Sequence, residues 1–275
     1  MDFRPGKAAC LLMFTLLCAP AMADKPAGGK PPADPTQDEL MMSAGFLSSH
    51  PDLRFRLNGQ KRYEKGEYGE AFSFFQRAAW YGDKPAQGMV AEMLWNGRGV
   101  DQDRALAYAW MDLAAERGYE GFVGHRERYW AALDEVERAR ALEVGQSVYA
   151  KYGDEASEPR LAAVLRRARA RQTGSRTGFS GALKIYIPGP GGDYLQIDGS
   201  RYYDENYWEP AKYRALQDSI WERSYTGRVD VGPVEKIGSD DPPHSRVPAT
   251  RPQTDTPEPQ SPEPDDGNLG TRPQP

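Results

Sequence analysis

The stretch WNGRGVDQDRALAYAWMDLAAERG, from Trp95 to Gly118, decides how the rest of the chain is interpreted. It opens with two glycines, continues with alanines between aromatic residues, and ends in glycine. Such a stretch is either an active-site loop that leads into a helix or one unit of a repeated helical scaffold. A nucleotide-binding loop requires a preceding strand and a following Lys-Ser or Lys-Thr pair, and the sequence offers neither. We therefore expect Gly97 and Gly99 to form a turn between two helices.

The same pattern occurs earlier in the chain, shifted by 36 residues, because RAAWYG at 77–82 corresponds to LAAERG at 113–118. In the earlier copy, small and aromatic residues fall at i, i+3, i+4, i+7 and i+8, which is one stripe of a helix: Ala71, Phe74, Phe75, Ala78 and Ala79. The later copy has Ala107, Trp110, Met111, Ala114 and Ala115 at the same positions. Self-similarity at this period is typical of stacked helical hairpins.

These residues resemble the Sel-one-like repeat, a relative of the tetratricopeptide repeat. The second unit matches the family pattern at Ala86-Gln87, Gly97-x-Gly99-Val100, Asp103, Ala107, Trp110, Ala114-Ala115 and Gly118. The clear resemblance covers about Tyr63–Gly118, although the first unit, in YEKGEYGEA, lacks the G-x-G-V turn. Its structural signature is Ala78, Ala79, Gly97, Gly99, Ala107, Trp110, Ala114, Ala115 and Gly118. The resemblance implies a mainly helical α-solenoid with a concave surface that binds other proteins and needs no catalytic group.

The amino terminus has the features of a cleaved secretory signal. Arg4 and Lys7 precede a short apolar run at 8–19, and the small-residue sequence Ala21-Met22-Ala23 follows. This order is typical of a signal peptide, so we expect cleavage after Ala23 and a periplasmic or extracellular protein. Cys18 could instead be a lipoprotein acylation site, but Leu17 stands where such signals have a small residue.

The remaining chain divides into four predicted segments. Residues 24–38 form a flexible leader, and residues 39–152 form the repeats, of which the last is degenerate and uses Val136, Ala139, Leu142, Val144 and Val148 as apolar positions. Residues 153–238 form a helix and a small α+β module. Residues 239–275 are rich in Pro and acidic residues and are expected to be disordered, because they cannot bury enough apolar surface.

The α+β module is predicted from a change of hydrophobic period. A helix begins near Ser157-Glu158-Pro159, with Ser as the cap and Pro in the first turn. LKIYI at 183–187 and YLQID at 194–198 are predicted as paired strands, and 208–225 as a helix with Tyr213, Leu216, Ile220 and Trp221 facing inward. GRVDVGP at 227–233 is predicted as a final short strand.

Residues with recognisable chemistry are few. Both cysteines lie inside the signal, so the mature chain has no disulfide or thiolate site. The histidines, His50, His125 and His244, have no nucleophile beside them, and adjacent carboxylates such as Asp134-Glu135 are typical of solvated surface. The net charge of −5 argues against a nucleic-acid partner. We therefore expect no catalytic residue, cofactor or metal site, and a protein that is not an enzyme.

A run without acidic residues, Arg160 to Gly192, contains several arginines. It is either a solvated helix face or a patch that contacts an anionic partner, with Arg166, Arg167, Arg169 and Arg176 as the candidate contacts. In the second case, binding would weaken steeply with salt.

Aromatic residues crowd into 186–225. They either fill the core of a small module or form a surface for sugars or proteins. Two functions follow from these observations. The first is a non-enzymatic scaffold with a protein partner bound through the repeats. The alternative is a module that binds an envelope glycan or anionic polymer through the Arg-rich and aromatic region.

Overall fold

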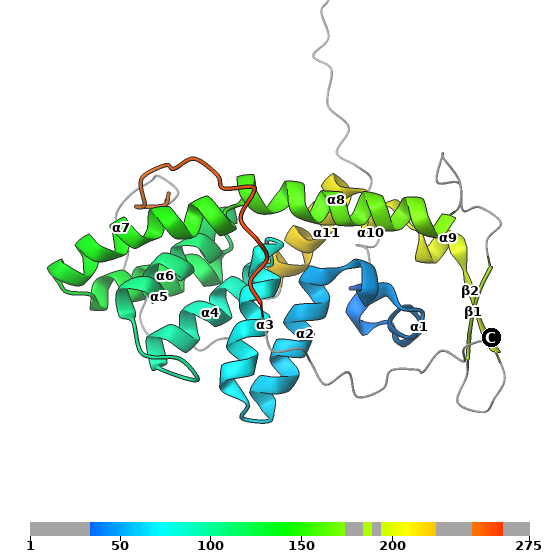
Figure 1. Ribbon diagram of the computed structural model, residues 1–275, viewed down its shortest axis with the longest axis horizontal. Coiled ribbons are helices and arrows are strands. Elements are labelled where there is room, and N and C mark those ends of the chain that lie inside the picture. The colour runs from blue at the N-terminus through cyan, green and yellow to red at the C-terminus, as the bar shows by residue number, and fades with distance from the viewer. Residues whose placement is uncertain (1–33, 174–183, 189–193, 224–243, 261–275) are drawn as a thin grey trace, which may run out of the picture. The chain divides into compact units, whose positions relative to one another are not determined.

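The computed structural model describes residues 34–173, 184–188, 194–223 and 244–260, which all belong to one compact unit (Figure 1). The fold is mainly helical with a small two-stranded sheet, as the hydrophobic periodicity of the sequence predicted. The helices before the sheet are η1 (Pro35–Gln37), α1 (Glu39–Ser43), η2 (Phe46–Ser49), α2 (Pro51–Glu64), α3 (Tyr68–Trp80), α4 (Lys84–Asn96), α5 (Arg104–Ala114), η3 (Ala115–Arg117), α6 (Glu120–Ala132), α7 (Glu135–Tyr152) and α8 (Asp154–Thr173). The sheet and the last helices are β1 (Lys184–Pro188), β2 (Tyr194–Asp198), α9 (Gly199–Tyr202), α10 (Glu205–Trp208) and α11 (Pro210–Arg223).

Helices α2 to α5 pack against one another in chain order, and α5 also contacts α6 and α7. Side-chain caps start α4 and α5: the Asp83 carboxylate accepts the Ala86 amide at 2.8 Å, and Asp103 accepts the Leu106 amide at 2.9 Å. The alanines of the repeated pattern are buried where the helices meet: Ala71, Ala78, Ala79, Ala107, Ala114 and Ala115. Small residues at these positions let large rings of neighbouring positions fill the remaining space.

Gly97 and Gly99 lie in the turn between α4 and α5, and both have a left-handed backbone, with φ of 64° and 76°. A Cβ atom at Gly99 would lie 2.5 Å from the backbone carbon of Tyr68. Glycine is therefore required at this position for two reasons, its conformation and the close approach of α3.

The predicted apolar positions of the third unit are partly wrong. Val136 is 78 % exposed and Ala139 is exposed, although Val148 is buried. The buried side of α7 instead contains Ala141, Gly145 and Val148. These residues are spaced by four and three positions, so the buried face of α7 differs from the predicted one.

A second hydrophobic cluster joins residues 41–53 to residues 165–213. Met41, Phe46 and Leu53 pack with residues of α8, the sheet and the last helices: Leu165, Ile187, Ile197, Tyr202, Tyr203, Trp208 and Tyr213. Residues 39–49, which the sequence analysis placed with the repeats, form short helices that pack with the residues of the predicted α+β module. Within the predicted leader, residues 34–38 are described and include η1; the others lie outside the described residues.

The sheet pairs β1 and β2 antiparallel, with Lys184 opposite Asp198 and Pro188 opposite Tyr194, which matches the two predicted strands apart from Leu183, outside the described residues. The helix predicted to start at Ser157 begins earlier, at Asp154, and Pro159 lies inside it. Its start is set by Gly153, whose extended backbone (ψ 161°) ends α7. The strand predicted at 227–233 also lies outside the described residues.

The segment predicted as a disordered tail is partly ordered. Residues 244–260, which we call the C-terminal segment, have no regular secondary structure but make specific contacts with several helices (orange in Figure 1). Proline-rich composition correctly excludes helix and sheet here. It does not exclude an extended chain that is held by side chains of a preformed surface.

Candidate functional site

The C-terminal segment lies against α3, α5, α6, α7 and α8. The surface that it contacts, which we call the groove, includes Arg77, Asp112, Glu127, Gly145 and Arg160. The Arg246 guanidinium of the segment makes two contacts with the Glu127 carboxylate of α6, Nη1 to Oε1 at 2.9 Å and Nη2 to Oε2 at 2.5 Å. The same guanidinium lies 5.0 Å from the centre of the Trp130 ring. Burial would raise the pKa of Glu127, but the hydrogen bonds from Arg246 and Arg126 outweigh it and lower this pKa. The carboxylate is therefore held ionised for the arginine.

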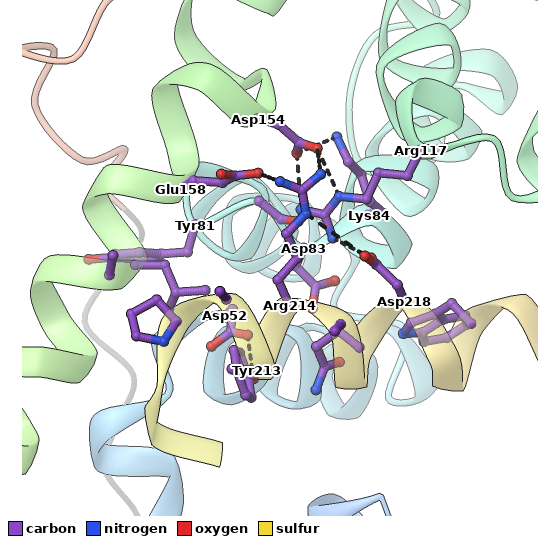
Figure 2. A pocket seen from close by; sticks show the side chains of 18 of the residues that line it. Asp52, Tyr81, Asp83, Lys84, Arg117, Asp154, Glu158, Tyr213, Arg214 and Asp218 are labelled. Atoms are coloured by element: carbon purple, nitrogen blue, oxygen red, sulfur yellow. Dashed lines mark hydrogen bonds and ion pairs between the residues drawn. The ribbon is translucent and has the colours of Figure 1, made fainter. Parts of the chain in front are cut away.

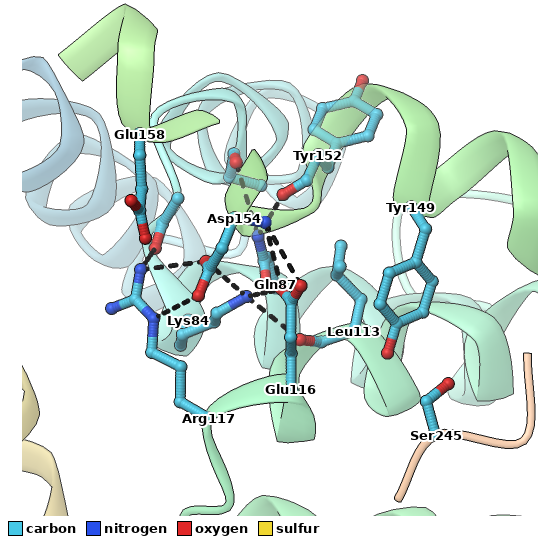
Figure 3. Close-up of polar contacts among 12 residues, drawn as sticks. Lys84, Gln87, Leu113, Glu116, Arg117, Tyr149, Tyr152, Asp154, Glu158 and Ser245 are labelled. Atoms are coloured by element: carbon cyan, nitrogen blue, oxygen red, sulfur yellow. Dashed lines mark hydrogen bonds and ion pairs between the residues drawn. The ribbon is translucent and has the colours of Figure 1, made fainter. Parts of the chain in front are cut away.

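The neighbouring Ser245 contacts a buried carboxylate of α5. Its hydroxyl donates to Asp112, which is fully buried and also accepts from the Tyr149 hydroxyl at 3.0 Å. Figure 3 shows Tyr149 and Ser245 side by side. Burial raises the pKa of Asp112, whereas the Ser245 hydrogen bond and the Arg126 charge lower it. Ser245 thus satisfies part of a group that would be costly to bury without partners.

The third anchor is Val247, which is 8 % exposed and rests on Gly145 of α7. A Cβ atom at Gly145 would lie 2.6 Å from a Val247 methyl group. The missing side chain at Gly145 therefore creates the space that the valine fills.

Farther along, the segment is held by main-chain contacts. The Gln253 amide donates to the Ala150 carbonyl at 2.5 Å, and the Arg160 guanidinium of α8 donates to the Gln253 carbonyl at 2.5 Å. At its end, the Glu258 carboxylate accepts from Arg77 and from the Tyr81 hydroxyl, both at 2.8 Å. The C-terminal segment is thus held along its length by side chains of α3, α5, α6 and α8 and by Tyr81, which follows α3.

A separate charged cavity of about 750 Å³ lies between α2, the α3–α4 turn, η3, α8 and α11 (Figure 2). Its central group is Asp154, which contacts Arg117 at 2.9 Å, Lys84 at 3.0 Å and Arg214 at 3.4 Å. Burial would raise the pKa of Asp154, but the charges of Lys84 and Arg117 lower it below its ordinary range. Asp218 of α11 also accepts from Arg117 at 3.1 Å. These ion pairs connect α11 to the helices before it.

A second charged group lines the same cavity. Arg56 pairs with Asp83 at 2.9 Å, and the Tyr213 hydroxyl donates to Asp52 at 2.6 Å. Burial raises the pKa of Asp83 to about 6, against the opposing charge of Arg56. Burial also raises the pKa of Asp52, which the Tyr213 hydrogen bond partly offsets. The lining contains more acidic than basic side chains, so its charge does not favour an anionic ligand.

The described residues among the predicted anion contacts lie on α8 and have different surroundings. Arg166 lines the charged cavity, Arg167 is exposed, and Arg169 acts electrostatically on Glu205. Arg176 lies outside the described residues. Of the aromatic residues described within 186–225, most belong to the second hydrophobic cluster. Tyr186 and Tyr194 are instead 58 % and 71 % exposed. Tyr213 and Trp221 line the charged cavity.

The groove residues Asp112, Glu127 and Gly145 were missed by the sequence analysis. They lie on three helices, and no local pattern relates them. One signal was present in the tail itself: Val247 is the single large aliphatic residue between Ser239 and Asn268, and it follows an arginine. An isolated apolar residue in a polar segment is a candidate anchor for docking.

The described residues contain no group of three or more His, Cys, Asp or Glu side chains placed to hold a metal ion. Within the same ranges, no helix has the length and apolar character needed to cross a membrane. Comparison with family models, curated proteins and solved structures found no match to this chain.

Proposed function

We propose that this protein is an exported, non-enzymatic scaffold that binds an extended segment of a partner protein in the groove that holds residues 244–260. The observation that carries the proposal is the bound C-terminal segment itself. It is a stretch of chain without secondary structure, and the helices hold it through charged side chains, a glycine-lined hole and main-chain hydrogen bonds. A surface that holds one extended chain has the chemistry to hold another.

We also propose that the helices of this scaffold are Sel-one-like repeats. Two observations support the 36-residue correspondence. Ala78 and Ala114 are both fully buried, and Gly82 and Gly118, at the ends of the two copies, have similar left-handed backbones with φ of 81° and 75°. Export rests on the signal-like amino terminus, so intact mass of the protein recovered from the cell envelope should correspond to a start at Asp24 without an acyl chain.

The proposed function is tested with a full chain whose own segment is weakened by Arg246→Gln and Val247→Ser, changes in the C-terminal segment alone. A fluorescent peptide of residues 244–260 should bind this variant saturably, as measured by fluorescence anisotropy. Circular dichroism of the variant should match that of the native protein. Absence of saturable binding to the folded variant would contradict the proposal.

A second candidate function is supported by the charged cavity. Its volume is typical of small-molecule sites, and it brings Arg166, Tyr213 and Trp221 together. The buried nitrogens Gln217 Nε2 and Trp221 Nε1 have no hydrogen-bond partner in the part of the chain that the structure describes. With its acidic lining, this cavity suits a neutral envelope glycan better than an anionic polymer.

Calorimetric titration with soluble cell-wall glycan fragments tests this candidate. Trp221→Ala should weaken binding of a neutral glycan, and Arg167→Gln, which changes an exposed arginine outside the cavity lining, should leave it unchanged at low and high salt. Loss of binding to Arg167→Gln at low salt would instead indicate an anionic polymer.

A further inference from the structure

Within the C-terminal segment, Ser245, Arg246 and Val247 are the consecutive residues whose side chains contact α5, α6 and α7. We infer that this part of the groove is a motif site for an extended segment in which Arg is followed by Val, and that residues 245–248 are its resident occupant, which a partner protein with the same motif displaces. The inference rests on the proposed peptide-binding function and adds the chemistry of the partner and the regulation of the groove.

The arginine is recognised by shape as well as by charge. Both oxygens of the Glu127 carboxylate face the two terminal nitrogens of Arg246, and the guanidinium also lies over the Trp130 ring. A planar guanidinium satisfies both contacts at once, whereas the ammonium group of lysine is a point charge that cannot form the paired geometry. The site should therefore discriminate between the two basic residues.

The valine is recognised by the hole above Gly145. Two Val247 methyl carbons lie 2.6 and 3.0 Å from the place where a Cβ atom of residue 145 would be. Any side chain at residue 145 would occupy the space of this valine. A ligand with glutamine or serine at the second position would leave the hole empty or bury a polar group in it.

The backbone of the motif is arranged for this contact. The Ser245 hydroxyl donates to Asp112 and accepts the Val247 amide at 3.0 Å, which links the first and third residues. Pro248 restricts the preceding valine to an extended backbone. A segment already restricted in this way loses less conformational entropy when it binds.

After Val247 the segment borders empty space. A cavity of about 260 Å³ is lined on the segment side by Ser245, Val247, residues 248–250 and Pro252, and on the other side by residues of η3, α7 and α8. Arg251 is exposed, so a second arginine only five positions after Arg246 provides a matched control. The difference in contact between these two arginines confines the motif site to residues 245–248.

The resident occupant competes with any partner because it belongs to the same chain. Only 20 residues separate Arg223 from His244, and a short tether gives an effective concentration on the order of millimolar. A partner peptide should therefore bind the native chain more weakly than a chain whose own motif has been altered.

The motif site is tested with four fluorescent peptides of residues 242–253: the native sequence, Arg246→Lys, Val247→Ser and the control Arg251→Gln. The receptor is the full chain that carries Arg246→Gln and Val247→Ser. We expect the first two changes to weaken binding at least tenfold and the control to bind within about twofold of the native peptide, since bidentate charged contacts are the strong ones. The native peptide should bind the unaltered chain at least tenfold more weakly than the receptor.

A receptor that also carries Glu127→Gln should lose its preference for Arg over Lys and remain folded by circular dichroism. Equal binding of all four peptides would overturn the motif and leave the peptide-binding function intact. Equal binding of the native peptide to the native and altered chains would overturn the resident occupant. Failure of every peptide, including residues 244–260, would overturn both the motif site and the proposed function.

Discussion

Gly99 is the residue at which sequence and structure agree most directly. The G-x-G-V pattern predicted a turn, and the turn needs glycine because of its left-handed backbone and its contact with Tyr68. Gly66 has the same kind of backbone, with φ of 79°, but a Cβ atom there would meet nothing within 4 Å. Substitution of Gly66 therefore measures the cost of a left-handed backbone alone, whereas substitution of Gly99 adds the cost of a steric clash with Tyr68.

We expect Gly66→Ala to lower the free energy of unfolding by about 1–2 kcal/mol, the usual cost of a left-handed backbone with a side chain. Gly99→Ala should cost at least about 1 kcal/mol more, because the added methyl group overlaps the backbone of α3. Urea denaturation of both variants measures the difference. Equal costs would show that the turn can move away from Tyr68.

His50 is a fully buried residue for which the sequence offered no partner. It precedes α2, stacks on Phe46 at 3.8 Å, and its ring nitrogens lie 2.9 Å from the Phe46 carbonyl and 2.8 Å from the Tyr207 carbonyl. Burial lowers the pKa of His50 from 6.5 to about 4, although these carbonyls oppose the shift. Its burial was not predictable locally, because the covering residues are at 207–213.

This shift predicts a pH dependence of stability. Since the folded-state pKa lies below the unfolded value, the unfolded chain binds more protons between about pH 4 and 6.5. The contribution of His50 to the free energy of unfolding is therefore complete above pH 6.5. It decreases by about 1.4 kcal/mol per pH unit as the pH falls through this range.

The measurement must isolate His50, because Asp83, whose pKa is raised to about 6, changes stability in the opposite direction. The difference in unfolding free energy between native protein and His50→Asn provides this isolation. An NMR titration of the ring should have its midpoint near pH 4. A midpoint above 6.5 would mean that both nitrogens donate to the two carbonyls and that the ring is charged in the fold.

At the scale of elements, α11 is attached through ion pairs as well as through its buried residues Tyr213 and Leu216. Asp154 of α8 and Asp218 of α11 share Arg117, which lies in the turn after α5. The side chains of Arg117 and Asp154 are each 12 % exposed. Arg117 and Lys84 would each lose an ionic partner if Asp154 were neutral, and breaking a buried pair is costly.

Asp154→Asn should therefore lower the free energy of unfolding by about 3 kcal/mol, the lower end of the range for a broken buried pair. Glu205→Gln, in an exposed pair with Lys212, should have no measurable effect. Chemical denaturation of both variants checks this prediction. A small effect of Asp154→Asn would show that Glu158 and Asp218 compensate for the lost charge.

Elements were predictable wherever one short stretch contains the whole signal. The stripes of alanine and aromatic residues predicted α3 and α5, and the alternation of apolar with other residues predicted β1 and β2. The start of α8 was misplaced by the Ser-Glu-Pro sequence, because Gly153 already permits the chain to leave α7. The face of α7 was also misplaced, since glycine and alanine in its contact face have little hydrophobic signal of their own.

At the scale of the whole molecule, the C-terminal segment should contribute to stability. Deletion of residues 244–275 would expose the space above Gly145 that Val247 fills, and it would remove one partner of Glu127 and one partner of Asp112. We expect the free energy of unfolding to fall by more than about 1 kcal/mol, beyond the range of ordinary surface changes. Denaturation of the shortened and full chains measures this loss. A change below about 0.5 kcal/mol would restore the original expectation of an undocked tail.

The groove could not be predicted from the sequence because its parts come from separate helices and from the distant tail. The Arg-rich run and the aromatic cluster were visible as compositions, but composition does not reveal which side chains share a cavity. Trp208 and Tyr213 are each 1 % exposed, so these two rings pack inside the protein instead of forming an aromatic surface.

The cluster that joins residues 41–53 to residues 165–213 has a consequence for how the chain folds. The contact between His50 and Tyr207 spans 157 residues, and the contact between Asp52 and Tyr213 spans 161. Closing such long loops costs entropy before any apolar burial offsets it. During synthesis, Met41 and Phe46 are made before most of their partners, which follow in α8, the sheet and the last helices. This end of the molecule should therefore fold last, and a stalled nascent chain should be cleaved by protease before α2 while its central helices are already protected.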